Sequence, residues 1–148
     1  MPSGGEIIFK FWVFCVFLLI FPCLVVLAGD TPSPKDAFLY IGWPNDGEII
    51  RGNRPFRIWF GLRNMGVAPK DVHIVNTGHH HLLIDTDLPP FDKVIPSDRN
   101  HFHFGAGQTQ TNLQLAPGKH TLLLLLGDHD HIPHNPPVFS KRITITIK

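Results

Sequence analysis

Hydrophobic and polar residues alternate with a period of two along most of the chain after residue 36. In the segments 56–63, 109–115 and 142–148, one set of alternate positions is largely apolar and the other is polar or charged. Successive side chains of a β-strand point to opposite faces of the sheet, so this pattern predicts strands with one buried and one exposed face. No segment in this part of the chain has a convincing helical spacing of apolar residues.

Two other segments, 82–84 and 121–126, are apolar at almost every position, which is typical of central strands covered on both faces. The Pro-Gly pair at 117–118 suits the middle of a tight turn, so segments 109–115 and 120–127 are expected to form a hairpin. Turn signals separate seven or eight short strands in all. This arrangement predicts an all-β fold, an immunoglobulin-like antiparallel β-sandwich.

The connection 85–100 departs from this regular spacing of short strands and turns. It is long, and it joins two segments that both contain histidine. Long loops inside compact domains are uncommon and often carry function. We therefore regard it as a candidate functional loop.

The N-terminal part of the chain has the layout of an export signal. Residues 11–27 carry no charge and consist mainly of large apolar side chains, with Lys10 before them and small residues at 28–29 after them. The length of this run fits either a signal peptide cleaved after Ala28 or a retained membrane anchor. The sequence thus predicts a signal or anchor at 1–28, a linker at 29–36 and one domain at 37–148. The expected location is the periplasm or the outer face of the cytoplasmic membrane, with 11–27 as the possible tether.

Cysteine content and charge exclude several kinds of chemistry. The only two cysteines, Cys15 and Cys23, lie in the apolar segment, so the predicted domain has no disulfide and no thiolate ligand or nucleophile. The formal net charge of the chain is +1, and no run of basic residues is present. A nucleic acid is therefore not an expected partner, because binding one normally requires a concentrated basic surface.

Histidine is the most informative residue type of the chain. All ten histidines lie between positions 73 and 134, and six of them form three His-x-His pairs. In a strand, residues two positions apart are separated by roughly 6–7 Å, and their side chains point to the same face. Both imidazoles of such a pair can therefore bind one ion at about 2.0–2.1 Å. The predicted metal ligands are the three pairs and one histidine that follows the last of them: His79, His81, His101, His103, His129, His131 and His134. A structural histidine network and a pH sensor are the alternatives to a metal site.

The neighbours of the histidines indicate where each ring points. Phe102 and Phe104 alternate with His101 and His103 and are expected to point inward, so both histidines should face outward. His80 lies on the same face of the expected strand as Leu82 and Ile84. It is therefore expected in the core, where it donates a hydrogen bond to a backbone carbonyl. Three aspartates near the pairs are candidates to orient the imidazole rings: Asp85, Asp128 and Asp130.

The available ligands restrict the choice of metal and rank the candidates. Imidazole-rich sites suit copper, zinc and nickel, whereas ions that select thiolates are excluded by the missing cysteines. Copper binds most tightly among these divalent ions, so copper is the first expectation and zinc the second. A blue-copper electron-transfer centre requires a cysteine ligand and is ruled out.

Three ordered blocks carry a family resemblance: GHHHLLID at 78–85, HFHFGAGQT at 101–109 and LLLGDHDHIPH at 124–134. Over roughly residues 38–148 the chain resembles an uncharacterised family of exported bacterial domains that is known only as a domain of unknown function. The resemblance implies that the histidine blocks define the domain. It implies no activity.

Three functions fit these observations. The first is an exported metal-binding protein that acts as a carrier, buffer or accessory subunit. The second is a cell-envelope module that binds polysaccharide or protein, in which outward aromatic residues such as Trp59 stack on sugar rings and the histidines are structural. The third is a metal-dependent enzyme, which is disfavoured because neither glutamate of the chain, Glu6 or Glu48, lies near a histidine block. A partner protein and self-association through a shared ion both stay open.

Overall fold

A computed structural model describes residues 29–52 and 54–148 of the chain. The predicted signal or anchor segment, with both cysteines, lies outside the described residues. Within the described ranges no helix is long and apolar enough to cross a membrane. The residues expected as a linker run beside a later loop, since the amide of Gly29 donates to the carbonyl of Pro133 at 3.2 Å and that of Ser33 to the carbonyl of Asn135 at 3.1 Å.

The smaller of two sheets has three antiparallel strands. Strand β3 (Phe56–Arg63) lies in its centre, between β1 (Phe38–Trp43) and β7 (Gln110–Leu113). Alternate residues of β3 are buried, among them Ile58 and Phe60. Arg57 and Trp59, which alternate with them, are exposed. The predicted period-two pattern is therefore confirmed in this strand.

The larger sheet has six strands, and its two longest strands are its centre. These are β5 (Thr77–Ile84) and β8 (Gly118–Gly127), which pair antiparallel over six residues. The remaining strands flank them in the order β2-β9-β8-β5-β4, with β6 also paired to β5: β2 (Ile49–Ile50), β4 (Gly66–Val67), β6 (His101–His103) and β9 (Ile143–Ile147). The two-residue strands β2 and β4 pair parallel with their neighbours, and the other pairings are antiparallel.

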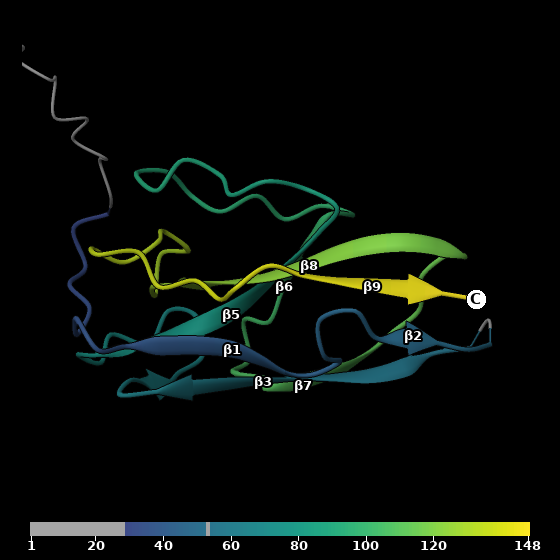
Figure 1. Ribbon diagram of the computed structural model, residues 1–148. Coiled ribbons are helices and arrows are strands. Elements are labelled where there is room, and N and C mark those ends of the chain that lie inside the picture. The colour runs from purple at the N-terminus through teal and green to yellow at the C-terminus, as the bar shows by residue number, and fades with distance from the viewer. Residues whose placement is uncertain (1–28, 53) are drawn as a thin grey trace, which may run out of the picture.

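The two sheets form the predicted immunoglobulin-like β-sandwich (Figure 1). Nine strands are described where seven or eight were expected, and the two shortest account for the difference. The main core lies between the sheets. It is formed by the inward residues of both sheets and of their connections, among them Leu39, Ile58, Phe60, Leu82, Leu122, Leu124, Leu126 and Ile145.

The expected hairpin between 109–115 and 120–127 is wrong. Strand β7 pairs with β3 of the small sheet, whereas β8 pairs with β5 and β9 of the large one. The Pro-Gly turn therefore carries the chain from one sheet to the other. The physical reason is that residues 122–126 are apolar on both faces and require cover on both sides, whereas β7 has only one apolar face to bury.

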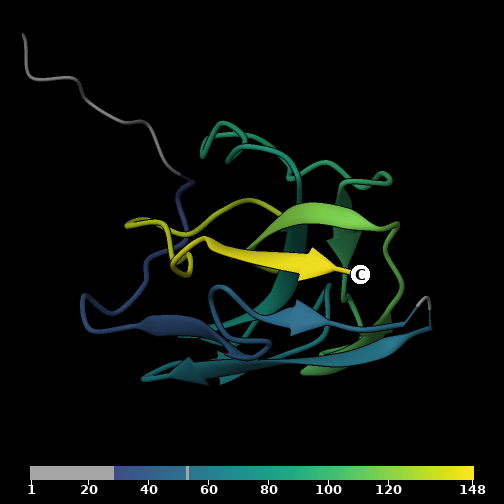
Figure 2. The ribbon, with the colours of Figure 1, turned by 45° about the vertical axis from the view of Figure 1, so that its right-hand side comes forward.

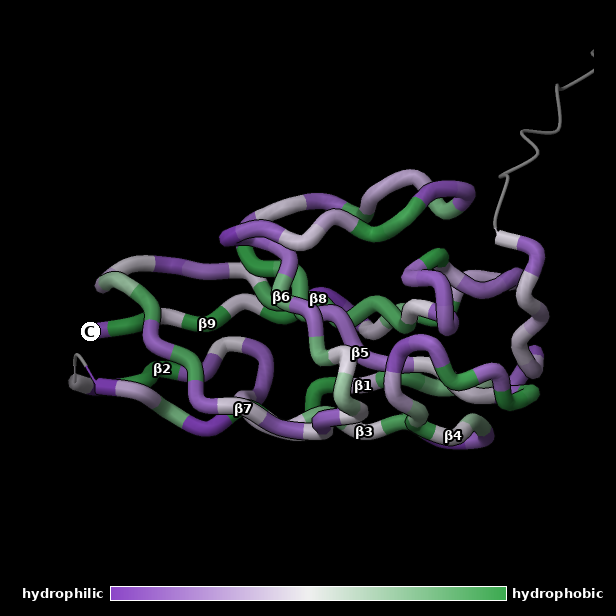
Figure 3. Tube along the Cα trace, turned by 180° about the vertical axis from the view of Figure 1, so that it is seen from behind, coloured by the Kyte–Doolittle hydropathy of each residue, from purple (hydrophilic) through white to green (hydrophobic). Residues whose placement is uncertain are grey.

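A second, smaller core lies on the outer face of the large sheet. Leu88, Phe91 and Ile95 of the connection 85–100 pack there on the outward leucines of β5 and β8, which are Leu83, Leu123 and Leu125. The connection forms a layer over the sheet in both ribbon views (Figures 1 and 2). It carries hydrophobic as well as hydrophilic positions (Figure 3), as a segment that covers apolar surface must.

Candidate metal-binding site

Four imidazole rings gather on this covered outer face of the large sheet. They belong to His79, His81, His103 and His131, and we call them the four-histidine cluster. The six distances between their ring centroids range from 4.6 to 6.1 Å. His79 and His81 are fully buried, and His103 and His131 are half-buried. The cluster therefore has a closed inner side and an outer side toward solvent.

Strand register brings three of the four rings together. His79 and His81 point from one face of β5 because they are two residues apart. The antiparallel pairing of β5 with β6 sets His81 directly opposite His103, so these two side chains share that face. The predicted His-x-His geometry is thus present in β5, and a neighbouring strand adds a third ring.

The nitrogen atoms of these rings have the spacing that one metal ion requires. Nε2 of His79 and Nε2 of His81 are 3.1 Å apart. Two nitrogens bound to one tetrahedral ion at about 2.0–2.1 Å are separated by roughly 3.3 Å. One ring nitrogen from each of His79, His81 and His103 lies within 4.8 Å of the others. The three rings can therefore coordinate a single ion after small movements.

His131 enters the cluster from the turn that follows β8. It has a left-handed backbone with φ of 65°, an uncommon conformation for a residue other than glycine. Its amide donates to the carbonyl of Asp128 at 3.0 Å, and its carbonyl accepts from the amide of Ile95 at 2.8 Å. The turn and the covering connection together fix this residue beside the rings of the two strands.

The buried carboxylate of Asp128 shapes that turn. It accepts hydrogen bonds from the amides of Asp130 and Ile132, both at 2.9 Å, and from the hydroxyl of Thr31 at 2.6 Å. Burial alone would raise the pKa of Asp128, but these hydrogen bonds keep the pKa below its ordinary value. Asp128 is therefore an anion near the cluster, and it acts on His131 by holding the turn.

Two glycines provide the space that the rings occupy. A β-carbon at Gly127 would lie 2.8 Å from Nε2 of His81, and one at Gly105 would lie 2.6 Å from Nε2 of His103. Both distances are too short for a real side chain to tolerate without movement of the ring. The sequence interpretation missed these glycines, although a glycine in or beside a strand often marks such a close approach.

The electrostatic environment keeps three rings of the cluster, those of His79, His81 and His103, neutral. Burial, reinforced by repulsion from the neighbouring histidines, lowers the pKa of His79 to about 4 and that of His81 to about 2. Burial is also the largest cause that lowers the pKa of His103, and repulsion from His131 and Lys70 lowers this pKa further. A metal ion binds the neutral imidazole, so these rings are in the ligating form at neutral pH.

Several nitrogens of these rings have no partner within the described part of the protein. Nδ1 of His79, Nδ1 of His81 and Nε2 of His103 are buried and make no hydrogen bond there. Buried polar atoms without partners are rare, because each costs about 1–3 kcal/mol. Nε2 of His80 and Nδ1 of His134, which lie outside the cluster, are also buried without a partner among the described residues, so this property is shared by histidines with a structural role.

The other three predicted ligands lie elsewhere. His101 binds the carboxylate of Asp98 through Nδ1 at 2.9 Å. The ring of His129 lies against that of His73, with centroids 3.7 Å apart. His134 is buried, and its Nε2 donates to the carbonyl of Thr77 at 3.1 Å. Each His-x-His pair after β5 therefore contributes one ring to the cluster and directs the other to a different contact.

His80 has the role expected from its parity. It is fully buried on the inner face of β5, against the ring of Phe60, and its Nδ1 donates to the backbone carbonyl of Gln108 at 3.1 Å. His101 and His103 share the outer face as expected, and Phe104 is buried as expected, but Phe102 is 38% exposed because the short strand β6 lies at the edge of the sheet. The outer face is covered by the connection 85–100, however, so neither ring is fully exposed.

Comparisons with known proteins bear on the family and add no activity. A model of the family described as "Domain of unknown function (DUF4399)" matches residues 58–148, which confirms the expected resemblance. No curated protein matches the chain. Among solved structures, the fibronectin(III)-like modules of CbhA from Clostridium thermocellum are similar with a TM-score of 0.38 and 11% identity, over 74% of this chain and 93% of that one.

Proposed function

The chain belongs to the DUF4399 family, and because that description assigns no activity, we propose a function from the four-histidine cluster. We propose that the protein is an exported copper-binding domain that acts as a carrier, buffer or accessory subunit. One copper ion is bound by His79, His81, His103 and His131. The observation that supports this most directly is the nitrogen spacing of 3.1 Å between His79 and His81, with a third ring nitrogen within 4.8 Å.

Copper is favoured over zinc by the donor set. All four ligands are imidazoles, no thiolate is present in the predicted domain, and a nitrogen site binds copper more tightly than zinc. The nearby carboxylate of Asp128 partly balances the charge of the bound ion. The negative charge of this carboxylate also raises the pKa of His79, although burial lowers that pKa by more. A stable all-imidazole site of this kind suits transport or storage of the ion.

The test is a metal titration of the wild-type protein and of single variants in which either histidine of a His-x-His pair is replaced. The full chain is purified in mild detergent without a histidine tag, stripped of metal, and titrated with copper and with zinc against a competing chelator. The expected result is one copper ion per chain, bound more tightly than zinc. His103→Gln or His131→Gln should weaken copper binding by more than about a hundredfold, since even outer-sphere partners of metal-binding histidines change affinity by roughly 10- to 100-fold.

The chain offers matched controls within the same sequence pairs. His101→Gln and His129→Gln remove the other member of each pair, whose ring lies outside the cluster, and should leave copper affinity unchanged. Equal losses in all four variants would contradict the assignment of ligands. Failure of the wild-type protein to bind either ion would overturn the proposed function, and tighter binding of zinc would overturn the choice of metal.

A further inference from the structure

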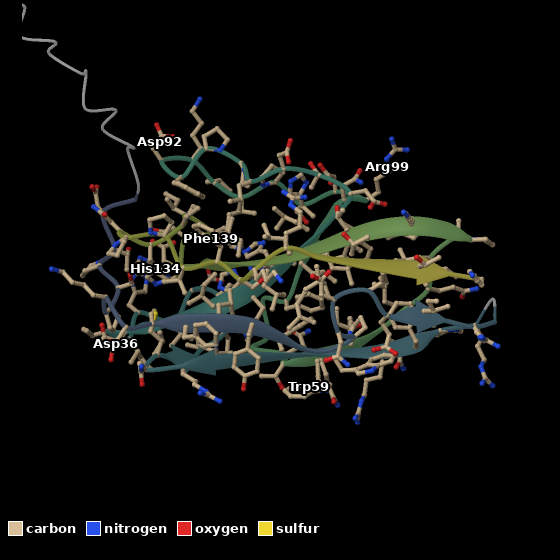
Figure 4. The ribbon with its side chains drawn as sticks, viewed as in Figure 1. Asp36, Trp59, Asp92, Arg99, His134 and Phe139 are labelled. Carbon is tan, nitrogen blue, oxygen red and sulfur yellow. The ribbon has the colours of Figure 1, made fainter. Side chains whose placement is uncertain are left out.

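The outer face of the small sheet carries a second concentration of functional side chains. Strand register sets Phe38 opposite Arg63, Arg57 opposite Asn112 and Trp59 opposite Gln110. Side chains directly opposite one another share a face, and Tyr40 joins them because it alternates with Phe38. We call these seven residues the aromatic–arginine face: Phe38, Tyr40, Arg57, Trp59, Arg63, Gln110 and Asn112. Figure 4 shows Trp59 on this outer side of the molecule.

Two aromatic rings of this face, those of Tyr40 and Trp59, pack edge to face with centroids 6.3 Å apart and an angle of 78° between their planes. The ring of Tyr40 covers Gly61, and the ring of Trp59 covers Gly42, so closely that neither glycine has room for a β-carbon. The rings of Phe38 and Tyr40 are stacked with centroids 5.6 Å apart. The rings of Tyr40 and Trp59 therefore pack on the backbone of the neighbouring strand, and Phe38 stacks on Tyr40.

Contacts with glycine and with one another leave part of these aromatic rings exposed. Phe38 is 55% exposed and Trp59 is 36% exposed. Partly exposed aromatic rings on a sheet are suited to stacking against the apolar face of a planar or ring-shaped ligand. This arrangement differs from a scattered surface aromatic, because neighbouring rings form a row along one strand and across to the next.

The charge of this face is entirely positive. Strands β1, β3 and β7 contain no aspartate or glutamate, and they present two exposed arginines, Arg57 and Arg63. The guanidinium carbon of Arg63 lies 5.5 Å from the centroid of the Tyr40 ring. Within the described residues no carboxylate forms an ion pair with either arginine. A guanidinium is well matched to a carboxylate of a ligand, with which it forms two parallel hydrogen bonds.

Two hollows adjoin on this face. One has a volume of about 500 Å³ and is lined by Gly42, Trp43, Arg57 and Trp59. The other has a volume of about 230 Å³ and is lined by Arg57, Gln110, Thr111 and Asn112. Ligand sites typically measure about 300–1,000 Å³. Arg57 lines both hollows, so an aromatic surface, a cation and two side-chain amides lie close together on this face.

We propose that the aromatic–arginine face binds an acidic polysaccharide, one whose sugar rings carry carboxylate groups. A sugar ring stacks on Trp59, its carboxylate pairs with Arg57, and its hydroxyls hydrogen-bond to the side-chain amides of Gln110 and Asn112. A chain of such sugars offers all three kinds of contact at every unit, whereas an acidic peptide such as polyglutamate offers charge and hydrogen bonds but no ring to stack on Trp59. This site lies on the opposite outer face of the sandwich from the four-histidine cluster, so the two proposals fail or succeed independently.

The test uses the full chain in mild detergent and three probes. A hexamer of galacturonic acid carries the proposed chemistry, maltohexaose is its neutral counterpart, and polyglutamate is an acidic polymer without sugar rings. Binding is followed by calorimetry at low and high salt. The expected result is saturable binding of the hexauronate that weakens with salt, and binding of the other two probes weaker by about tenfold or more.

Two variants and two matched controls test the residues. Trp59→Ala and Arg57→Gln should each weaken binding of the hexauronate by about tenfold or more, since a single aromatic or arginine anchor commonly contributes that much. Phe139→Ala and Arg99→Gln change an exposed aromatic and an exposed arginine elsewhere and should bind as the wild type does. Arg57→Gln keeps the proposal testable if loss of the Trp59 packing unfolds the sheet.

Three outcomes would overturn the proposal. The first is no binding of the hexauronate by a wild-type protein that is folded by circular dichroism. The second is unchanged binding by Arg57→Gln. The third is equal binding of polyglutamate, which would indicate an acidic protein segment as the partner. None of these results depends on whether copper is bound, so the copper site can be tested separately on the same preparation.

Discussion

At the scale of single residues, the four-histidine cluster depends on two glycines, because the lack of a side chain at these positions leaves room for the imidazole rings. Gly127 lies opposite His79 in the register of β8 and β5, and it leaves room for the ring of His81. Gly105 does the same for the ring of His103. A site built from bulky rings on adjacent strands requires such gaps, because protein interiors are otherwise close-packed.

This requirement leads to a prediction for Gly127→Ala. The added methyl group would lie 2.8 Å from Nε2 of His81, so the ring must rotate away from its neighbours. We expect copper affinity to fall by about tenfold or more and the free energy of unfolding to fall by about 1–3 kcal/mol, the usual range for overpacking. Chelator competition and chemical denaturation measure the two quantities.

Gly66→Ala is the matched control for that substitution. Its added β-carbon would approach the Thr77 methyl carbon at 3.1 Å, far from any imidazole nitrogen. It should leave copper affinity unchanged. If Gly127→Ala and Gly66→Ala bound copper equally well, the ring of His81 would not be a ligand.

The sequence predicted which histidines lie on the same face of a strand. It did not predict which of them come together in one cluster. Parity correctly grouped His79 with His81 and assigned His80 to the core. Parity alone treats His101 and His103 as equivalent, and only the register of β6 against β5 sets His103 opposite His81. The position of His131 was not predicted either, because it depends on a left-handed turn that Asp128 stabilises and on the connection 85–100 that binds its carbonyl.

At the scale of the elements, the strands were predictable and their partners were not. The period-two segments 56–63, 109–115 and 142–148 all contain strands with the expected buried face. The turn at 117–118 was also real, but turn residues define a change of direction and not the sheet that the next strand joins. The deciding factor was apolarity on both faces of β8, which places it in the centre of the larger sheet.

The connection 85–100 is the element that closes the site, and Ile95 is its main anchor. This side chain is 2% exposed in the smaller core, and the amide of the same residue binds the carbonyl of His131 at 2.8 Å. We predict that Ile95→Ala lowers the free energy of unfolding by about 2–4 kcal/mol, as large-to-small core substitutions do. We also expect faster release of copper, because the connection would hold His131 less firmly.

Val94→Ala provides the comparison for this prediction. Val94 precedes Ile95 in the same connection, yet it is 59% exposed and contributes little to the smaller core. Denaturation and stopped-flow transfer of copper to a chelator would compare the two variants. Equal stability and equal release rates in both would show that the connection does not hold the cluster closed.

At the scale of the whole molecule, the two outer faces of the sandwich differ in character. The large sheet carries neutral rings beneath a covering connection, and the small sheet carries exposed rings beside arginines. A β-sandwich keeps its core between the sheets, so both outer faces are free for separate functions. The two proposed sites would allow one domain to bind an ion on one face while it is attached to an acidic polymer on the other.

Burial of so many neutral histidines also fixes how stability depends on pH. Burial lowers the pKa of His79 and His80 to about 4 and that of His81 to about 2, whereas the unfolded chain takes up these protons near pH 6.5. Between about pH 6.5 and 4 the unfolded state therefore binds more protons than the folded state. The free energy of unfolding of the metal-free protein should fall as pH falls, by roughly 1 kcal/mol per pH unit for each of the three histidines.

The carboxylates of the protein cannot produce the same effect in that window. The hydrogen-bonded aspartates have pKa values lowered from an ordinary value of 3.8, so their contribution is lost only as pH falls further. The pKa of His120 is different, because burial would lower it but hydrogen bonds to Asp85 and to a backbone carbonyl raise it. Its contribution is present below pH 6.5 and decreases as pH rises, so it opposes the trend.

Chemical denaturation of the metal-free protein at several pH values between 7 and 4.5 would measure this dependence, and His80→Phe separates the core from the cluster. His80 lies among apolar side chains on the inner face, so its replacement should reduce the slope by about one third and leave copper affinity unchanged. Copper should add stability at pH 7 and lose that effect on acidification, because protons compete for the same nitrogens. A stability that stayed constant from pH 7 to 4.5 would mean that the histidines gain protons in the folded protein as readily as in the unfolded chain, and it would contradict a buried neutral cluster.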